Sequence, residues 1–312
     1  DEAFNQIRNT YNNEGGTRFY DNSALYHAHG EYKFTPSFVN TWTVGGNMRL
    51  YAPDSRGTIF YDTAGTKITN FEFGLYTGIE KKTNNDKFTF SATARVDKNE
   101  NFGFLFSPAA SVVFKPKAGN FLRFSFASAI RNPTLSDQYL FLNVGRAILA
   151  GNIEGAQDLI TVNSFFDYVN TLDTRLLKYF DIDPIRPEKV KTFEVGYRTT
   201  LFNKLFADMG YYYSIYNDFL GYNIGITGTF DPVSGFPSNV QAYRYAANST
   251  NQVTTQGASM GLSYYFSKYY QLSGNYSWNK LNKDFEDDPI IPAFNTPEHK
   301  YNLGFSGRDI PL

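Results

Sequence analysis

Two histidines and a run of carboxylates are the residues whose types and spacing could bind a metal ion. His27 and His29 stand two residues apart, so on a β-strand both would point to one face and could chelate a metal. The acidic run over residues 284–288 offers oxygen ligands for Ca²⁺, but it lacks the spacing and the turn glycine of an EF-hand. The pattern favours a polar wall around the histidines and a solvated loop for the acidic run. We therefore predict neither a metal site nor a cofactor.

No arrangement of side chains predicts catalysis. The 312 residues contain no cysteine and only three histidines, which excludes thiol chemistry and a disulfide framework. The stretches "GYRTT" and "GFSGR" lack the context of a nucleophile elbow, and no glycine-rich phosphate-binding loop is present. The net charge is −1 and the basic residues are scattered, so no nucleic-acid patch is expected. We predict that the protein is not an enzyme and does not bind nucleic acid.

Aromatic side chains gather in two long segments, 132–188 and 219–250, which we interpret as loops. Aromatic side chains on such loops could stack on sugar rings, anchor a protein partner, or pack the loop against itself, and the sequence leaves these alternatives open. If the chain carries a ligand site, we expect it in these two segments. The predicted ligand-binding residues are Tyr139, Phe141, Phe165, Phe166, Tyr168, Tyr222 and Tyr243.

The elements that carry these loops are predicted to be long β-strands. Aromatic residues make up 18% of the chain, yet the mean hydropathy is only −0.40, and no stretch approaches the roughly 18 apolar residues of a membrane helix. In "FADMGYYYSIY" (206–216), apolar and more polar residues alternate with period two. Similar alternation predicts about eleven strands, over 23–34, 40–52, 68–80, 87–98, 103–115, 120–131, 190–200, 204–218, 253–266, 269–280 and 299–308.

The length of the strands and of their connections indicates a membrane. Strands of soluble proteins usually have five or six residues, whereas twelve residues span about 40 Å, or about 28 Å of hydrocarbon when tilted near 45°. Short connections such as "TPSF" and "FNK" alternate with long ones, as in bacterial outer-membrane barrels. The fold class predicted is therefore an all-β, transmembrane, antiparallel β-barrel. A soluble β-sandwich or solenoid is the alternative, which strand length and loop asymmetry oppose.

The two faces of these strands suit lipid on one side and water on the other. In the tyrosine-rich strand the lipid-facing residues would be Ala207, Met209, Tyr211, Tyr213 and Ile215. The opposite faces carry charges of both signs, which are costly against lipid but can pair in a polar interior. The predicted lumen-lining residues are Glu72, Arg95, Arg123, Glu194, Arg198 and Asp208.

The strand count predicts that the barrel is incomplete. Counting connections places the first residues outside and the tail "GRDIPL" inside, which requires an odd number of strands. Bacterial barrels have an even number, and open edges in lipid would leave backbone groups without partners. We expect residues 1–312 to be part of one transmembrane β-barrel domain, with further strands outside this chain.

Three segments carry a family resemblance. "FLRFSFASAIRNPTLSDQYLF" (121–141) resembles the strand of TonB-dependent outer-membrane receptors that ends in a "FRAPTLSELY"-like exit, with Arg131, Pro133 and Leu135 at corresponding places. "RPEKVKTFEVGYRTTLFNKLFADMGYYYSIYNDF" (186–219) resembles the next block of the family. "YYFSKYYQLSGNYSWNKL" and "NTPEHKYNLGFSG" look like strands of its Bacteroidetes-type members, including SusC-like receptors. The match covers most of 120–310, and residues 1–119 match only in style. Pro133 can end strand pairing, so these exit residues are expected to form the base of a loop.

The resemblance implies a 22-stranded barrel, of which this chain would hold about eleven strands, and an N-terminal plug that this chain lacks. It implies a location in the outer membrane of a Gram-negative bacterium. It further implies import of a scarce or bulky nutrient ligand, driven by TonB through a segment absent here. Outer-membrane lipid and a surface lipoprotein of SusD type are the further partners considered. The alternatives are a related barrel serving as a scaffold without transport, a soluble β-rich adhesin or carbohydrate-binding protein, and a passive porin.

Overall fold

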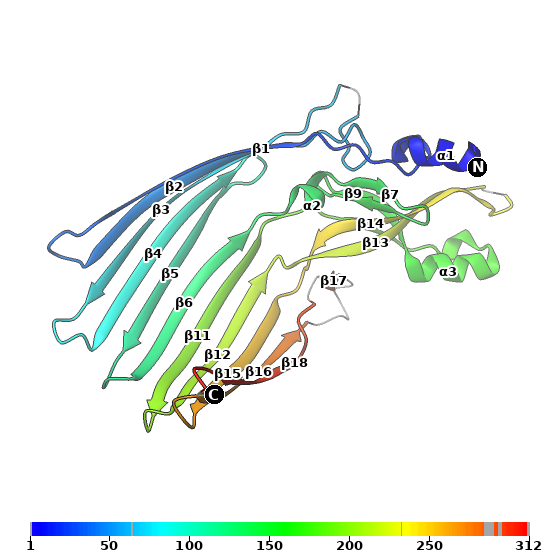
Figure 1. The fold of residues 1–312 in the computed structure, drawn as a ribbon. Helices are drawn as coiled ribbons and strands as arrows, with labels where there is room; N and C mark the ends of the chain where they lie inside the picture. Colours follow the sequence, from blue (N-terminus) through cyan, green and yellow to red (C-terminus); the bar gives the residue numbers. More distant parts are fainter. Residues whose placement is uncertain (1, 64, 232, 284–289, 293–294, 311–312) are drawn as a thin grey trace.

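The computed structural model describes residues 2–63, 65–231, 233–283, 290–292 and 295–310. Eleven long strands form one curved, antiparallel sheet, which we call the barrel sheet (Figure 1). Sequential neighbours pair throughout, except where long connections leave and return to the sheet. The strands are β1 (Ala24–Phe34), β2 (Thr41–Ala52), β3 (Asn70–Lys82), β4 (Phe88–Asn99), β5 (Phe104–Phe114), β6 (Asn120–Arg131), β11 (Glu188–Leu201), β12 (Leu205–Asn217), β15 (Val253–Tyr265), β16 (Tyr270–Asn282) and β18 (His299–Gly307).

These strands confirm the eleven predicted ones, with each end within two residues of its predicted position. They have 9 to 13 residues, apart from β11 with 14, which is the length that a tilted strand needs to cross a bilayer. Among the described residues no helix is long and apolar enough to cross a membrane.

One face of the barrel sheet is apolar along its whole width. Met209, Met260 and Tyr276 lie directly opposite one another on β12, β15 and β16, and all three side chains are exposed. Phe124 and Val195 form a second such pair on β6 and β11. Directly opposite residues point to the same side of a sheet, so these pairs define a continuous outer face, suited to contact with lipid.

Aromatic residues mark the rim where the short turns lie. The rings of Phe88 and Phe114 stack with centroids 4.7 Å apart beside one turn, and Phe34 lies 4.9 Å from Trp42 beside another. Aromatic girdles of this kind sit at the interface between hydrocarbon and headgroups. The short-turn end of the barrel sheet is thereby placed at one membrane surface.

The long connections are folded, so our interpretation of 132–188 and 219–250 as loops was wrong. They form a second sheet, which we call the outer sheet, with strand order β10-β9-β13-β14-β8-β7 and β17 paired to β13. Figure 1 shows it beyond the end of the barrel sheet opposite the short turns. Its elements are α2 (Leu135–Tyr139), β7 (Phe141–Asn143), β8 (Ile148–Ala150), β9 (Ala156–Thr161), α3 (Val162–Thr171), η2 (Thr174–Leu176), β10 (Tyr179–Ile182), β13 (Leu220–Phe230), β14 (Pro237–Asn248) and β17 (Ile291–Pro292).

Buried apolar residues hold the outer sheet together. Leu159 of β9 packs with Ile182 and Ala247, while Ile160 on the opposite face of the same strand packs with Tyr168 of α3. The sheet therefore has apolar clusters on both faces, which explains why it stands as a folded unit. The N-terminal residues form α1 (Glu2–Asn9) and η1 (Asn12–Glu14), which lie at the same end of the molecule in Figure 1.

Candidate functional site

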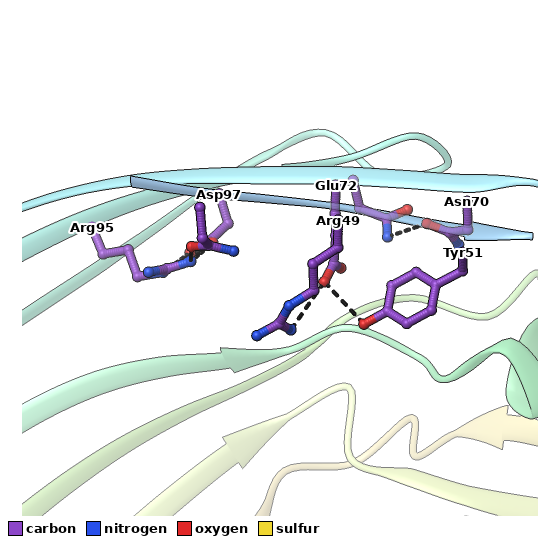
Figure 2. A network of polar contacts seen from close by, with 8 residues as sticks. Arg49, Tyr51, Asn70, Glu72, Arg95 and Asp97 are labelled. Atoms are coloured by element: carbon purple, nitrogen blue, oxygen red, sulfur yellow. Dashed lines mark hydrogen bonds and ion pairs between the residues drawn. The ribbon is translucent and has the colours of Figure 1, made fainter. Parts of the chain in front are cut away.

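Charged side chains on β2, β3 and β4 pair on the face opposite the apolar one. Arg49 donates to Glu72 at 3.3 Å, and the Tyr51 hydroxyl donates to the same carboxylate at 3.4 Å. Arg95 donates to both oxygens of Asp97. Figure 2 shows these side chains pointing away from their strands into the hollow of the curved sheet, so we call this the inner face.

A second charged cluster lies on the inner face of β6, β11 and β12. The Asp208 carboxylate accepts from Arg123 at 2.8 Å and from Arg198 at 2.7 Å. Glu194 accepts from the Ser125 hydroxyl at 3.2 Å. Opposite Arg123 stands Gly196, where a Cβ would lie 2.8 Å from the arginine Nε, so a larger residue would force the guanidinium to move. The structure thus places all six predicted lumen-lining residues on one polar face.

A cavity of about 610 Å³ lies where the inner face meets the segment that leaves β6. Its floor carries Arg49, Glu72, Arg95 and Asp97, and the segment 130–136 covers one side. Arg131, Pro133 and Leu135, the residues that carry the family resemblance, all line it. Its charges and amides offer both donors and acceptors, and its basic side chains (Arg49, Arg95, Lys98 and Arg131) outnumber its carboxylates (Glu72 and Asp97), which suits a polar ligand.

A buried amide network fixes the covering segment to the barrel wall. Asn99 donates to Asn70 at 2.7 Å, and Asn70 donates to Gln138 of α2 at 3.1 Å. Asn101 also donates to Gln138, at 2.7 Å, and Gln138 donates to the carbonyl of Pro133 at 2.7 Å. These amides could not be predicted from the sequence because their partners are distant along the chain, and only the period-two position of Asn70 and Asn99 pointed to the inner face.

The short helix α2 is defined by its N-terminal cap. The Thr134 side chain accepts from the backbone of Asp137, and the Asp137 carboxylate accepts from the backbone of Thr134, which forms a reciprocal capping box. Pro133 precedes this cap and cannot donate to a strand ladder, so β6 ends and the helix begins at this point. The cap and the proline together aim Gln138 at the barrel wall.

His27 and His29 lie on the inner face of β1. His29 lies 3.0 Å from the hydroxyl of Tyr76, which donates to Glu31 at 2.8 Å. Over the residues that the structure describes, no group of three His, Asp or Glu side chains could hold a metal ion. The acidic run at 284–288 lies outside the described residues. The register of β1 on β2 puts both histidines on the polar face, opposite Arg49 and Asn47.

The seven predicted ligand-binding aromatics are spread over the outer sheet and do not meet at one site. Phe141 packs edge-on against Tyr61 with centroids 5.5 Å apart, and the Tyr139 hydroxyl accepts from Asn101 at 2.6 Å. The Arg244 guanidinium lies over the Tyr222 ring at 4.7 Å, and Tyr243 stacks on Tyr245, 5.4 Å away.

The three aromatics of α3 have different environments. Phe166 is exposed, whereas Phe165 packs against the core of the outer sheet. Tyr168 is fully buried beside Phe230, and its hydroxyl donates to the carbonyl of Gly235. A side chain without exposed surface cannot contact a ligand, so Tyr168 is corrected to a core residue of the outer sheet.

Comparison with known proteins identifies the fold. A family model described as TonB dependent receptor-like, beta-barrel, matches residues 1–309. The chain belongs to this family. Receptor barrels of this family lie in the outer membrane of Gram-negative bacteria, which is therefore the location of the chain, and they are receptors rather than enzymes.

Solved receptor structures share the fold at low sequence identity. The siderophore receptor PirA from Acinetobacter baumannii matches 95% of this chain and 42% of its own, with 14% identity and a TM-score of 0.63. A ferric enterobactin receptor (PfeA) mutant from Pseudomonas aeruginosa, in complex with enterobactin, matches 92% of this chain and 40% of its own, with 15% identity and a TM-score of 0.64. The FrpB iron transporter from Neisseria meningitidis matches 83% and 36%, with 14% identity and a TM-score of 0.54. This chain spans less than half the length of each. No curated protein sequence matches it significantly.

The connection between β2 and β3 of the receptor barrel is organised by one carboxylate. Asp62 is buried and accepts hydrogen bonds from the Ser55 hydroxyl at 2.6 Å, from the Gly57 N–H at 2.7 Å, and from the Ser55 N–H. Burial opposes ionisation of this carboxyl, but the hydrogen bonds outweigh it and lower the pKa of Asp62. The stabilisation is therefore fully present above the unfolded pKa of about 3.9 and is lost as the pH falls through the lower folded pKa.

We predict that Asp62→Asn loosens this connection at neutral pH, because an amide group can accept at only one of its two ends. The chain has no cysteine, so a spin label on Thr66→Cys reports on the segment alone. In the parent the label should stay immobile at pH 7 and become mobile only in acid, below the ordinary carboxyl pKa of about 3.9, whereas in the Asp62→Asn variant it should be mobile in both conditions. Asp54→Asn, which removes a nearby carboxylate that makes none of these bonds, should resemble the parent. A label that stays equally immobile at pH 7 in the Asp62→Asn variant would contradict this role.

Proposed function

We propose that this chain is the wall portion of a TonB-dependent receptor that imports a scarce or bulky ligand across the outer membrane. In this proposal the outer sheet captures the ligand, a plug closes the lumen until TonB remodels it, and the ligand then passes along the inner face. The observation that carries the proposal is the polar cavity of about 610 Å³ at the junction of the outer sheet and the inner face. A passive porin would not need a folded sheet and a buried amide network at this junction.

We infer that the plug and further barrel strands belong to the same protein outside these 312 residues. In the described residues, β1 and β18 are each paired on one side only, and an open edge in lipid is unfavourable. The structural relatives, which are more than twice as long, support this inference. A native protein with a mass near the 35.4 kDa of this chain would refute it.

Ferric siderophores are the first ligands to test, because PirA and PfeA are siderophore receptors and FrpB is an iron transporter. The SusC-like resemblance makes oligosaccharides the second class and keeps a surface lipoprotein of SusD type as a prediction. The cavity on the inner face favours a polar ligand that carries acceptor or anionic groups, since four basic side chains line it against two carboxylates.

The proposal is tested by uptake in the native bacterium. Deleting the gene of the full-length receptor and deleting TonB should abolish uptake of the same ligand, when labelled ferric siderophores and oligosaccharides are offered in turn. Arg49→Gln should lower that uptake at unchanged surface abundance, because it removes a charge from the cavity floor. Lys87→Gln, in a short turn at the far end, is the matched control and should leave uptake unchanged. Uptake that persists without TonB would overturn the importer proposal, and an outer-membrane complex lost with the receptor would then favour a scaffold.

A further inference from the structure

The outer sheet contains a break at which β13 changes partners. Gly221 and Tyr222 pair with β17, whereas Gly225 and Ile226 pair with β9. Asn223 and Ile224 lie between these two partners. The Ile224 N–H, which faces no strand partner on the β9 side, is satisfied at 2.8 Å by the side chain of Asn223.

A cavity of about 700 Å³ opens at this break and has mostly apolar walls. Phe180 and Ile182 of β10 line it on one side, and Ile224, Ala247 and Ile291 line it on the other. Its volume lies in the range of small-molecule sites, which are typically apolar with a few polar groups that orient the ligand. It shares no lining residue with the cavity on the inner face.

The polar groups at the rim of this cavity carry an excess of negative charge. Asp181 and Asp183 line it, and the side chain of Asp183 is largely exposed. Arg186 is the one basic side chain among the described lining residues. Its guanidinium already contacts Asp183 at 3.4 Å and Asp218 at 3.2 Å, so it cannot neutralise Asp181 as well.

The second set of polar groups at the rim consists of amides. The Asn248 side chain is fully engaged, because it accepts from the backbone of Arg186 and donates to two backbone carbonyls. Asn163 and Asn223 also line the cavity. The side-chain oxygen of Asn223 accepts from the Ile224 N–H at the break, so its NH₂ group points away from that N–H. The rim therefore combines carboxylates with amides around an apolar interior.

We propose that this cavity binds an amphipathic cation, a small ligand with an aromatic or aliphatic body and an ammonium group. The body would fill the space between Phe180, Ile182 and Ile224, and the ammonium group would lie against the carboxylates of Asp181 and Asp183. An anion of the same shape would meet a rim that stays net negative, because the one guanidinium, of Arg186, is shared between Asp183 and Asp218. Binding at this site does not require import, so it is independent of the proposed function.

The test measures binding to the full-length, detergent-solubilised protein by saturation-transfer NMR, with empty micelles as the blank. Tryptamine supplies the aromatic cation, and indole-3-propionate is an anion of similar shape. We expect tryptamine to bind and indole-3-propionate not to bind. The double variant Asp181→Asn, Asp183→Asn should weaken tryptamine binding by roughly tenfold, as expected for two partly exposed charge contacts.

Two further variants separate the site from general charge effects. Asp167→Asn removes an exposed carboxylate of α3 that does not line the cavity, and it should bind tryptamine as the parent does. Ile224→Trp should abolish binding by filling the cavity, provided that its melting curve matches that of the parent. The proposal is overturned if tryptamine does not bind, if both probes bind equally, or if the double aspartate variant binds like the parent.

Discussion

Met260→Arg is expected to destabilise the barrel strongly, whereas Ser259→Arg, one residue away, is expected to be tolerated. Both positions lie near the middle of β15, and both side chains are exposed. Met260 faces outward between Met209 and Tyr276, whereas Ser259 faces inward opposite Gly210. An arginine against the bilayer midplane costs about 2–4 kcal/mol, and the same side chain in a polar lumen remains hydrated.

Folding of the full-length protein into lipid vesicles measures this difference. The folded fraction is read from heat-modifiable migration on gels over a urea series. Met260→Arg should reduce the stability of the folded barrel by about 2 kcal/mol or more, and Ser259→Arg should reduce it by less than about 1 kcal/mol. Equal losses would contradict the assignment of one lipid-facing and one lumen-facing side to the sheet. A larger loss for Ser259→Arg would mean that the two faces are assigned the wrong way round.

The barrel sheet was predictable because each strand is specified by its own residues. Alternation between lipid-facing and lumen-facing side chains is a local signal, and every strand of the barrel sheet has nine residues or more over which it can be read. The same alternation placed Arg123, Glu194 and Asp208 on one face. Their pairing was not predictable, because it depends on the register of strands as distant as β6 and β12.

The outer sheet was not predicted, although part of its signal is present. Leu220, Tyr222, Ile224 and Ile226 alternate with smaller or polar residues along β13, as in a barrel strand. The length of the two segments and their position between barrel strands suggested loops. The strands β7 to β10 have only three to six residues each. Strands so short acquire their structure from the neighbours that they pair with, which a single sequence does not reveal.

The environments of the aromatic residues also depend on tertiary structure. Phe166 and Tyr168 stand two residues apart on α3, where the helical period sends them to different sides. Phe166 is exposed, and Tyr168 is buried against Phe230 of β13. Composition indicated aromatic residues in this segment, but only the packing of α3 on the outer sheet separates surface residues from core residues.

Gln138→Leu is expected to detach the covering segment from the barrel wall. Gln138 of α2 is 2% exposed, and it accepts hydrogen bonds from Asn70 and Asn101. It therefore connects α2 to the barrel wall. Leucine would remove three hydrogen bonds and leave Asn70, Asn101 and the carbonyl of Pro133 without this partner. Asn101 is exposed and keeps its bond to Tyr139, but Asn70 and the Pro133 carbonyl are buried. Each buried polar group left unpaired costs about 1–3 kcal/mol, so we expect a loss of about 3 kcal/mol.

We expect a local loss. The residues that directly follow Gln138 pair with the β2–β3 connection and not with the strands of the barrel sheet. The Phe141 N–H donates to the carbonyl of Ile59 at 2.9 Å, and the Tyr61 N–H donates to that of Tyr139 at 3.2 Å. Hydrogen exchange at these two amides should therefore accelerate by roughly a hundredfold, which corresponds to about 3 kcal/mol, while amides inside β11 and β12 keep their protection. Ser136→Ala changes an exposed side chain of the same helix and should leave both regions unaffected. Unchanged exchange would show that the network does not hold the segment. Faster exchange throughout the barrel strands would show that Gln138 supports the wall itself and not its cover.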